Sequence, residues 1–452
     1  MTYEAESGNF TVALVGDLMV NRRLAGFREP EFTGLVEILQ AADVTLANLE
    51  TQINDFELPW AQKPDSISWQ VGSPEILDDL KEMGIRGVTV SNNHSYDYNE
   101  AGLLTTMRHL KSRGIAYAGG GANLDDARAP ALVDLPRGRV ALFGATTTFN
   151  ELSVAGLARP DFPGRPGING LHHEKVHFVP RHVFDALVEA KVALKYKEFE
   201  EVHHGFHPHR VEHYDEATEV RFLGQKFRLA DGYGTHTSCS QADLDGILKW
   251  IRGASKQADW VFYSTHCHES GDEGQLHEIH RPSAPEFLVE FAHWTIDQGC
   301  DGFTGHGPHI LRGIEIYKGR PIFYSLGNFI FNNDTVQRQP DPAYRRQGLT
   351  HDHTPGDWGA KRSGDDTYGF PVDPAFFRSA VAVCRYAAGK LAEIRIYPLD
   401  LGYGRPMSQR GRPMLADQAL AVEILVGLQE VSAPFGTTIE IEGRVGVIRV
   451  NA

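Results

Sequence analysis

The sequence predicts an α/β protein in which helices cover the faces of a sheet. Two observations lead to this prediction. Short apolar runs that are typical of buried strands alternate with segments of helical length over residues 11–146, and the same alternation resumes over residues 240–306. Strands that alternate with helices of about 10–15 residues indicate an α/β sheet.

In the first of these blocks, local signals mark the elements. The segment "SPEILDDLKEMG" gives the clearest helix, because Ser73 is a candidate N-cap, Pro74 suits the first helical position and Gly84 suits the stop. The predicted strands of this block are 11–17, 43–50, 87–93, 115–120 and 140–146, and its predicted helices are 30–42, 73–84 and 99–114.

The second block continues the pattern, and a C-terminal part completes it. A hairpin is expected to turn at Lys318 and Gly319. Two stretches interrupt the alternation: one is polar and rich in histidine with a single helical piece, and the other reads as a long irregular loop of the kind that is usually functional. We therefore expect one domain over residues 1–452 with two insertions. The predicted segments are helices 240–258, 284–299 and 414–431, strands 259–266 and 301–306, insertions 150–236 and 332–376, and a C-terminal part 377–452 that also contains a β-hairpin and a last strand pair.

Composition excludes several classes of protein. The chain has 452 residues, of which 41% are hydrophobic and 23% charged, as in ordinary globular proteins. A formal net charge of -15 argues against non-specific binding to nucleic acid or to an anionic membrane. The N-terminus has no signal-peptide pattern, and no apolar run approaches the roughly 20 residues of a membrane helix. We expect a cytoplasmic protein without nucleic-acid or membrane partners, whose four widely spaced cysteines are reduced thiols.

Polar side chains follow five of the predicted strands at the point where each strand ends. In open α/β sheets, ligands bind beyond the carboxyl ends of the strands. Each residue taken alone has a structural interpretation, since an aspartate after a strand often forms a turn and "NNH" is often a polar turn. Their coincidence at one edge favours a ligand site. The residues are Asp17, Glu50, Asn92, Asn93, His94, His266, His268, Glu269, His306 and His309.

The stretch "GHGPH" at residues 305–309 has three interpretations when read alone, namely a pair of metal ligands, a phosphate cradle or a polar turn. Its combination with the other strand ends favours metal ligation. Carboxylates, an amide oxygen and imidazoles suit Zn²⁺, Mn²⁺, Fe²⁺ or Ni²⁺ better than Ca²⁺ or Mg²⁺. A carboxylate such as Glu50 can bridge two ions ~3.5–4 Å apart. We expect one or two divalent ions.

Six motifs, in this order, resemble the CapA family, which is named for poly-γ-glutamate capsule synthesis and is a branch of the calcineurin-like metallophosphoesterases. They are "GDLMVNR", "NLET", "SNNHSYDYNEAGL", "YAGGG", "STHCHE" and "GHGPHILRGIEIYKGRPIFYSLGNFIF", within residues 11–146 and 241–331. The resemblance implies that the chain is a single metallophosphoesterase-like domain. Its expected fold is a four-layer α/β/β/α sandwich with large loop insertions.

The resemblance also implies roles for the strand-end residues. One metal position would use Asp17, Glu50 and His309, and the other would use Glu50, Asn93, His266 and His306. The first position is expected to have fewer protein ligands, because Met19 stands where the superfamily has a histidine. His94 matches the proton-donating histidine. His268, within the unusual "STHCHE", is the second histidine expected to take part in catalysis.

The implied activity is that of a metal-dependent hydrolase. Such a site would use metal-activated water to cleave an amide bond, γ-glutamyl or peptide-like, in a small or peptide substrate with free carboxylates. Three alternatives stay open. They are phosphoester hydrolysis, metal-dependent epimerisation of a peptide with histidines as acid and base, and a non-catalytic polymer-binding protein that keeps the fold. A homo-oligomer is also left open.

The two insertions carry further candidate residues. Nine histidines between residues 172 and 213 form either a metal-binding tract or part of a polar lid or subdomain, and His204 is one that could reach the site. The second insertion has a basic run that is either a solvated face or a binding surface for carboxylate or phosphate. The residues expected to contact substrate are Asn92, His204, Asn328, Arg338, Arg345 and Arg346.

Overall fold

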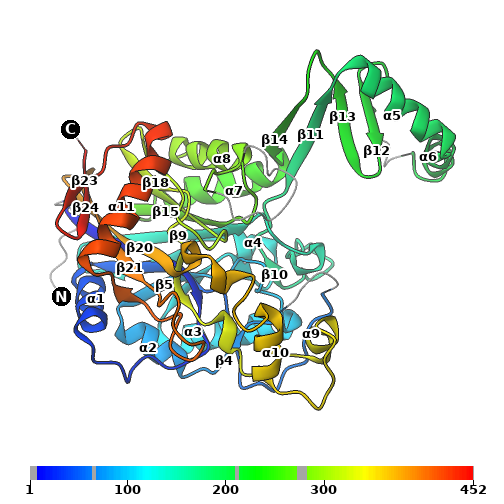
Figure 1. Ribbon diagram of the computed structural model, residues 1–452. Helices are drawn as coiled ribbons and strands as arrows, with labels where there is room; N and C mark the ends of the chain where they lie inside the picture. Colours follow the sequence, from blue (N-terminus) through cyan, green and yellow to red (C-terminus); the bar gives the residue numbers. More distant parts are fainter. Residues whose placement is uncertain (1–7, 64–67, 209–212, 272–281, 451–452) are drawn as a thin grey trace.

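The computed structural model describes residues 8–63, 68–208, 213–271 and 282–450, and two large β-sheets surrounded by helices dominate it (Figure 1). The first sheet follows the order β23-β24-β21-β20-β1-β2-β5-β6, with β19 beside β1 and β22 beside β21. Its strands are β1 (Phe10–Met19), β2 (Val44–Asn48), β5 (Ile85–Thr89), β6 (Ala116–Ala118), β19 (Asn328–Phe331), β20 (Arg378–Ala387), β21 (Lys390–Asp400), β22 (Met414–Leu415), β23 (Glu440–Glu442) and β24 (Val445–Arg449).

The second large sheet follows the order β17-β18-β16-β15-β9-β8. The α/β class is thus confirmed, and the strands are divided between two large sheets. The strands of the second sheet are β8 (Ala131–Leu135), β9 (Gly138–Thr146), β15 (Trp260–His266), β16 (Gly302–His306), β17 (Ile314–Tyr317) and β18 (Arg320–Phe323). Two small pairs are β3 (Gln52–Ile53) with β4 (Val71–Gly72), and β7 (Gly120–Gly121) with β10 (Gly167–Ile168).

The inner strands of each sheet run in the same direction. In the first sheet β1, β2, β5 and β6 are parallel, and in the second β9, β15, β16 and β18 are parallel. Their carboxyl ends therefore collect at one edge of each sheet. The hairpin between β17 and β18 turns where expected, at Lys318 and Gly319, which both have positive φ.

Side chains that alternate along the strands divide the core into separate clusters. Leu14 of β1 and Phe262 of β15 belong to one hydrophobic cluster that both sheets share. Their neighbours point the other way: Val15 lies in a cluster with α1, α2 and α3, and Tyr263 lies in a cluster with α7 and α8. This period of two is what a strand buried on both faces requires. The four cysteines are free thiols and three of them are buried, as expected.

The helices beside the two sheets lie close to their predicted positions. Gly114 ends α3 in the left-handed conformation, as its place in the sequence indicated. The start of α2 differs, because Ser73 bonds the Glu75 side chain and the helix begins only at Ile76. No helix in the described ranges combines the length and hydrophobicity needed to cross a membrane. The helices are α1 (Pro30–Ala41), α2 (Ile76–Glu82), α3 (Asn99–Arg113), α4 (Leu124–Arg128), α7 (Gln241–Ala254), α8 (Glu286–Asp297) and α11 (Gln418–Ser432).

The expectation that residues 332–376 form an irregular loop is wrong. The segment contains α9 (Asp341–Arg346) and α10 (Pro355–Ser363). A capping box between Thr354 and Asp357 starts α10, and buried Trp358 donates its indole N–H to a carbonyl of α9 at 3.1 Å. These local signals are short and lie in a polar stretch, which is why periodicity did not indicate them.

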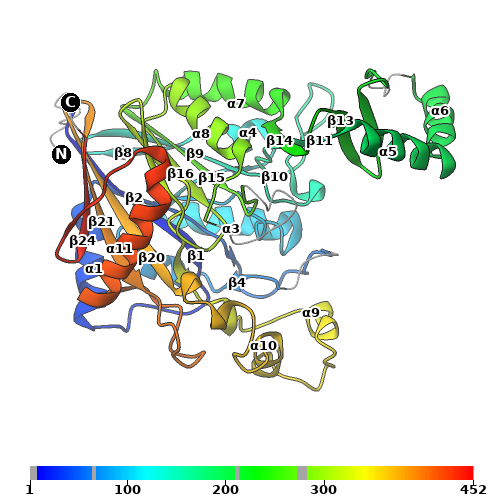
Figure 2. The same ribbon diagram turned by 45° about the horizontal axis from the view of Figure 1, so that its top comes forward.

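Residues 173–239 form a small module that extends away from the two large sheets (Figures 1 and 2). It has two helices where one was expected, because Lys195, with φ of 62°, interrupts the helical stretch. Of its histidines, His209 lies outside the described residues. The elements of the module are β11 (His173–Val179), α5 (Arg181–Ala193), α6 (Tyr196–Phe206), β12 (Glu219–Phe222), β13 (Gln225–Leu229) and β14 (Gly234–Cys239).

His172 anchors the root of this module to α7. Its Nδ1 lies 2.7 Å from Oδ2 of Asp243, and its Nε2 lies 3.3 Å from Oε2 of Glu151. Burial alone would lower the pKa of His172, but hydrogen bonds to these two carboxylates outweigh it and raise the pKa above its usual value. A histidine with a raised pKa stabilises the fold below the pKa of the unfolded chain, and this stabilisation is lost as pH rises through the folded pKa.

We therefore predict that replacing His172→Gln lowers the unfolding temperature more at about pH 6 than at about pH 9. Calorimetry of both proteins at the two pH values measures this difference. The matched control is His182→Gln, an exposed histidine on α5 of the same module. Equal losses of unfolding temperature at the two pH values would contradict the role given to His172.

Candidate metal centre

The "GHGPH" stretch forms the end of β16 and a tight loop that brings two histidines against Asp17. Gly307 has φ of 106°, and a Cβ there would lie 2.9 Å from the backbone nitrogen of Cys267. Its N–H donates to Oδ2 of Asp17 at 3.0 Å. His309 also has positive φ, 60°, which is uncommon for a residue with a side chain and is found mostly where surrounding contacts enforce it.

Asp17, at the end of β1, is fully buried and held in its charged form. The amide of Asn48 donates to its Oδ1 at 2.8 Å, and Nδ1 of His306 and of His309 lie 3.4 and 3.5 Å from its two oxygens. Burial would raise the pKa of Asp17, but the nearby imidazoles of His306 and His309, together with the charge of His266, outweigh it and hold the pKa well below its usual value. Asp17 is therefore an anionic donor between the two sheets.

Glu50, just beyond β2, is fully buried but lacks comparable partners. Within the described part of the chain, neither of its carboxylate oxygens has a hydrogen-bond partner. Imidazole nitrogens of His266 and His309 lie 3.8 and 3.7 Å from its Oε1. Burial, together with the charges of Asp17 and Asp97, raises the pKa of Glu50 well above its usual value. Burying an ionised carboxylate without a partner is costly, and a bound cation is what would offset that cost.

His266 and His268 face each other across this centre. Their Nε2 atoms are 3.0 Å apart. Two imidazole nitrogens that bind one Zn²⁺ at ~2.0–2.1 Å lie about 3.3 Å apart in tetrahedral geometry, so this spacing fits a shared ion. Burial and the nearby imidazole of His268 keep the pKa of His266 well below its usual value. Its neutral form is the one that binds metals.

Two further donor atoms are buried without a hydrogen-bond partner among the described residues. They are Oδ1 of Asn93 and Nδ1 of His306. Buried polar atoms are nearly always satisfied in native proteins, so such exceptions call for an explanation. An amide oxygen and an imidazole nitrogen beside Glu50 and Asp17 are donor types that a transition-metal ion accepts. The donor set thus fits a divalent ion.

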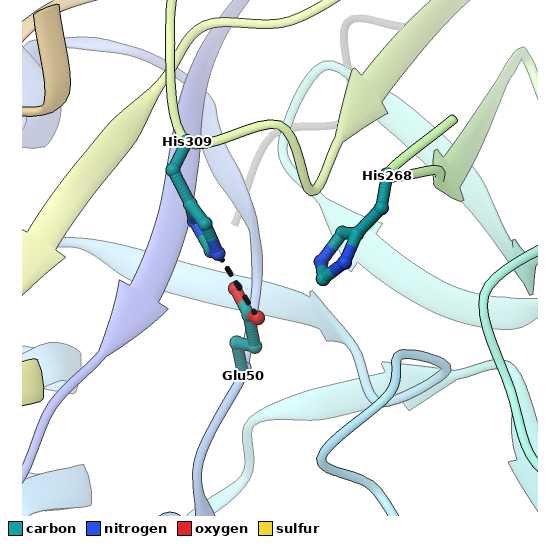
Figure 3. Close-up of side chains that lie close together, drawn as sticks. All are labelled: Glu50, His268 and His309. Carbon is teal, nitrogen blue, oxygen red and sulfur yellow. Dashed lines mark ion pairs between the residues drawn. The ribbon is translucent and has the colours of Figure 1, made fainter. Parts of the chain in front are cut away.

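The carboxylates and imidazoles form two overlapping groups that share Glu50. One group is Asp17, Glu50 and His266, and the other is Glu50, His268 and His309. Figure 3 shows the second group, with the ion pair between His309 and Glu50. Glu50 is the common member of both groups. In these groups His266 lies with Asp17 and His268 lies with His309. The ligand sets that the resemblance implies stay a prediction.

Asn328 of β19 lies beneath His309 and orients its ring. Oδ1 of Asn328 is 2.9 Å from Nδ1 of His309, and its amide nitrogen donates to the carbonyls of His309 and Phe376 at 3.2 and 3.1 Å. A partner on one ring nitrogen decides which nitrogen faces a metal. Here the contact leaves Nε2 directed at Glu50. The structure therefore shows Asn328 as a support for His309, and its predicted contact with substrate stays a prediction.

His94 sits beside the centre in a chain of polar contacts. Its Nδ1 lies 2.7 Å from Oδ2 of Asp97, and Asp97 also bonds Lys63 and accepts from the backbone N–H of Gln70 at 2.6 Å. Burial lowers the pKa of His94, although Asp97 opposes this effect. Burial would raise the pKa of Asp97, but Lys63 and His94 lower it. His94 is thus held in one orientation by a charged carboxylate.

Residues 11–333 match the family described as bacterial capsule synthesis protein PGA_cap. The chain belongs to this family. The match includes every metal-ligand candidate described above, from Asp17 at the end of β1 to His309 beyond β16. The part of the chain after residue 333 holds α9, α10 and the C-terminal strands.

Three known proteins resemble the chain to different extents. The uncharacterized protein y4sH of Sinorhizobium fredii (strain NBRC 101917 / NGR234) is 36% identical over 454 residues, covering 98% of this chain and 93% of that protein. The capsule biosynthesis protein CapA of Bacillus anthracis is 23% identical, over 72% of this chain and 61% of that protein. The PGA biosynthesis protein CapA of Bacillus subtilis (strain 168) is 23% identical, over 71% and 63%.

The residues predicted to contact substrate are spread more widely than the metal-ligand candidates. Asn92 joins the strand ends, since its amide donates to the carbonyl of Leu49 at 2.8 Å and its Oδ1 accepts from the backbone of His94 at 3.1 Å. His204 lies on α6, at the outer end of the projecting module, so the structure does not bring it to the centre (Figures 1 and 2). The polarity of its surroundings in the sequence could not reveal this separation.

The three arginines of the second insertion that are predicted to contact substrate are exposed. Arg338 lies over the ring of Phe56 at 4.4 Å, and Arg345 pairs with Asp341 within α9 at 2.7 Å. Arg346 donates to the carbonyl of Lys63 at 2.9 Å, which links it to the polar chain that ends at His94. Their role in binding substrate stays a prediction.

Sequence reasoning did not single out two residues that organise the centre. Asp97 follows His94 by three positions, and its Oδ2 lies 2.7 Å from Nδ1 of His94. An acidic residue three positions after His94 could have been predicted from the sequence as a partner for its imidazole. Lys63, by contrast, lies in a segment without periodicity, and its pairing with Asp97 depends on a contact between residues 34 positions apart.

We predict that divalent metal raises the unfolding temperature of chelator-treated protein and that Glu50→Gln abolishes this rise. Occupancy at 100 times the dissociation constant contributes about 2.7 kcal/mol. Without metal, the variant should be at least as stable as the native protein, because it lacks a buried unpaired carboxylate. Thermal unfolding with and without Mn²⁺ or Zn²⁺ measures both effects. Glu290→Gln, an exposed change on α8, is the control; an equal rise in Glu50→Gln would show that the metal binds elsewhere.

Proposed function

We propose that this PGA_cap family member is a metal-dependent hydrolase that cleaves an amide bond in a substrate bearing carboxylates. The observation that carries the proposal is Glu50, a buried carboxylate with no hydrogen-bond partner among the described residues, shared by two groups of donor side chains. A non-catalytic binding protein has no evident need for such a costly arrangement. Perturbed groups of this kind cluster at functional sites.

The proposal includes the finer fold assignment, a metallophosphoesterase-like four-layer α/β/β/α sandwich. One hydrophobic cluster shared by the two large sheets supports this assignment. Two further clusters support it as well, since one joins the ten-stranded sheet to α1–α3 and the other joins the six-stranded sheet to α7 and α8. In this assignment, the metal centre lies where the carboxyl ends of the parallel strands of both sheets meet.

In the proposed mechanism, one or two divalent ions would be held by carboxylates and imidazoles, with the amide oxygen of Asn93 as an additional donor. The carboxylates and imidazoles are those of Asp17, Glu50, His266, His268, His306 and His309. A bound divalent ion at this place lowers the pKa of water and polarises a carbonyl or phosphoryl oxygen. The chain itself supplies orientation. Asn48 fixes Asp17 and Asn328 fixes His309, so two of the donors are held before a ligand arrives.

His94 is the proposed proton donor to the leaving group. Its ring is nine-tenths or more buried, and its Nδ1 is bound to Asp97, so Nε2 is the atom available to move a proton. Asp97 acts as a positioning residue, because its carboxylate sets the orientation of the ring and stabilises the protonated form. Lys63 in turn keeps Asp97 charged.

The names of two relatives, together with the chemistry of the centre, support a substrate class. Two relatives are described as proteins of capsule biosynthesis and of PGA biosynthesis. A polymer of glutamate joined by amide bonds offers both an amide to cleave and free carboxylates, and we propose γ-glutamyl or peptide-like amides as substrates. Phosphoesters are the competing substrate class, because the same donor types polarise a phosphoryl oxygen.

Metal-dependent epimerisation is a second candidate, and the pair of imidazoles at the centre favours it. His268 lies close enough to His94 to lower its pKa, so two imidazoles could serve as acid and base. Epimerisation exchanges a carbon-bound hydrogen, whereas hydrolysis cleaves the chain. Incubation of γ-glutamyl peptides in D₂O separates them: α-carbon deuterium without cleavage supports epimerisation, and cleavage without α-carbon deuterium supports hydrolysis.

We predict that His94→Gln lowers kcat by about 10²–10⁴-fold, the usual contribution of general acid–base catalysis. Asp97→Asn should also lower kcat, by a smaller factor, while the rise in unfolding temperature on adding metal is retained in both variants. Hydrolysis of γ-glutamyl p-nitroanilide and of p-nitrophenyl phosphate by the metal-loaded protein measures turnover for the two substrate classes. His182→Gln is the control. Unchanged kcat in His94→Gln would remove His94 from the mechanism.

A further inference from the structure

A cavity lies beside the β1–α1 connection, and arginines dominate its wall. Its volume is ≈ 240 Å³. No acidic side chain occurs among the described residues that line it, which is unusual in a chain with a formal net charge of -15. Leu24, Phe27 and Asn332 contribute to the wall, and the arginines are Arg22, Arg23, Arg405 and Arg412.

Two segments that are distant in the sequence supply the arginines of this wall, and Arg22 ties these segments together. Its guanidinium donates to the carbonyls of Ser408 and Arg410 at 2.6 and 2.7 Å. Arg22 and Arg23 come from the β1–α1 connection, whereas Arg405 and Arg412 come from the connection between β21 and β22. The fold itself, through the hydrogen bonds of Arg22, therefore holds the wall of the cavity in place.

Carboxylates outside the cavity hold three of the arginines. Arg23 pairs with Asp79 at 2.6 Å, Arg412 pairs with Glu29 at 2.9 Å, and Arg405 lies 3.8 Å from Asp400. Arg412 also lies 3.9 Å from the centre of the Phe27 ring. A guanidinium has five N–H donors, so one carboxylate on one side leaves donors for a second anion on the other.

Arg22, by contrast, donates its hydrogen bonds to the backbone carbonyls of Ser408 and Arg410. Burial lowers its pKa, and repulsion from Arg412 lowers it further. Asp334 opposes this repulsion but is itself bound by Arg410 at 2.6 Å. Two partly buried guanidinium groups thus repel each other at the wall of a cavity that has no lining carboxylate. An anion between them would relieve the repulsion.

We propose that this cavity is a binding site for a small ligand with two or more oxyanion groups, carboxylate or phosphate, and that it is separate from the metal centre. Planar guanidinium forks match both groups, since each can accept two parallel N–H bonds. The volume suits a small anion, because sites for drug-sized ligands measure about 300–1,000 Å³. The site does not depend on the proposed hydrolase activity.

The cavity lies close to the metal centre along the chain. Arg22 follows Asp17 by five residues, so their Cα atoms are within about 18 Å even in a fully extended chain. Asn332 of the wall donates its backbone N–H to the carbonyl of Met19, near the end of β1, at 2.8 Å. An acidic ligand that the net charge of the chain would otherwise repel thus meets a positive surface next to the centre.

The test is calorimetric titration of chelator-treated protein at low ionic strength with tricarballylate, a tricarboxylate, and separately with inorganic phosphate. Arg405→Gln and Arg412→Gln should each weaken binding at least about tenfold, the loss expected for one charge-assisted hydrogen bond. Arg22→Lys, which keeps the charge but not the fork, should also weaken it. Comparison of the two dissociation constants shows whether the cavity prefers carboxylate or phosphate groups.

Two controls distinguish this site from other anion binding. Arg345→Gln removes an exposed arginine of α9 outside the cavity and should leave the affinity unchanged. Asp17→Asn alters the metal centre and should also leave it unchanged, so a failure of the proposed hydrolase would not affect this result. The proposal is overturned if neither anion binds the native protein, if the arginine substitutions have no effect, or if Asp17→Asn abolishes binding.

Discussion

The burial of two carboxylates, Asp17 and Glu50, at the junction of the two large sheets is the constraint on which the rest of the centre depends. Both side chains are fully buried. Asp17 is compensated by His306 and His309 and stays charged, whereas Glu50 has no such compensation and its pKa rises. A chain that buries both must either keep a proton on Glu50 or bind a cation. The imidazole nitrogens and the amide oxygen around the two carboxylates are donor types that a cation accepts.

The junction is rigid because the strand ends are bonded to one another through the backbone as well as through side chains. The N–H of Cys267 donates to the carbonyl of His306 at 2.8 Å, which holds the ends of β15 and β16 together. The N–H of Gly307 donates to Asp17 and so joins the two sheets. Only a residue without a side chain fits there, which explains the glycine between the two histidines. Donors fixed in this way lose little entropy when a ligand binds.

The sequence allowed the strand ends to be predicted because a buried parallel strand is a short local pattern, and the polar residue after it is adjacent in the chain. It did not reveal which sheet each strand joins. β1 pairs with β20, more than 350 residues away, and β9 pairs with β8 and β15 in a different sheet from β6. The contacts of Asp97 with Lys63 and of Asn328 with His309 also join residues that are 34 and 19 positions apart. Periodicity therefore located the donors, and only the fold shows what orients them.

Met19 shows how the centre departs from the expected ligand pattern. The superfamily resemblance places a histidine at this position, and its absence was expected to leave one metal position with fewer protein ligands. In the structure Met19 is buried in a hydrophobic cluster with Ile310 and Phe331, where an imidazole would lack the polar partners that it needs. The second donor group is instead completed from the other sheet by His268, which reaches Glu50 and His309. In the proposed metal centre, the unusual "STHCHE" motif thus compensates for the missing histidine, and both ion positions keep carboxylate and imidazole ligands.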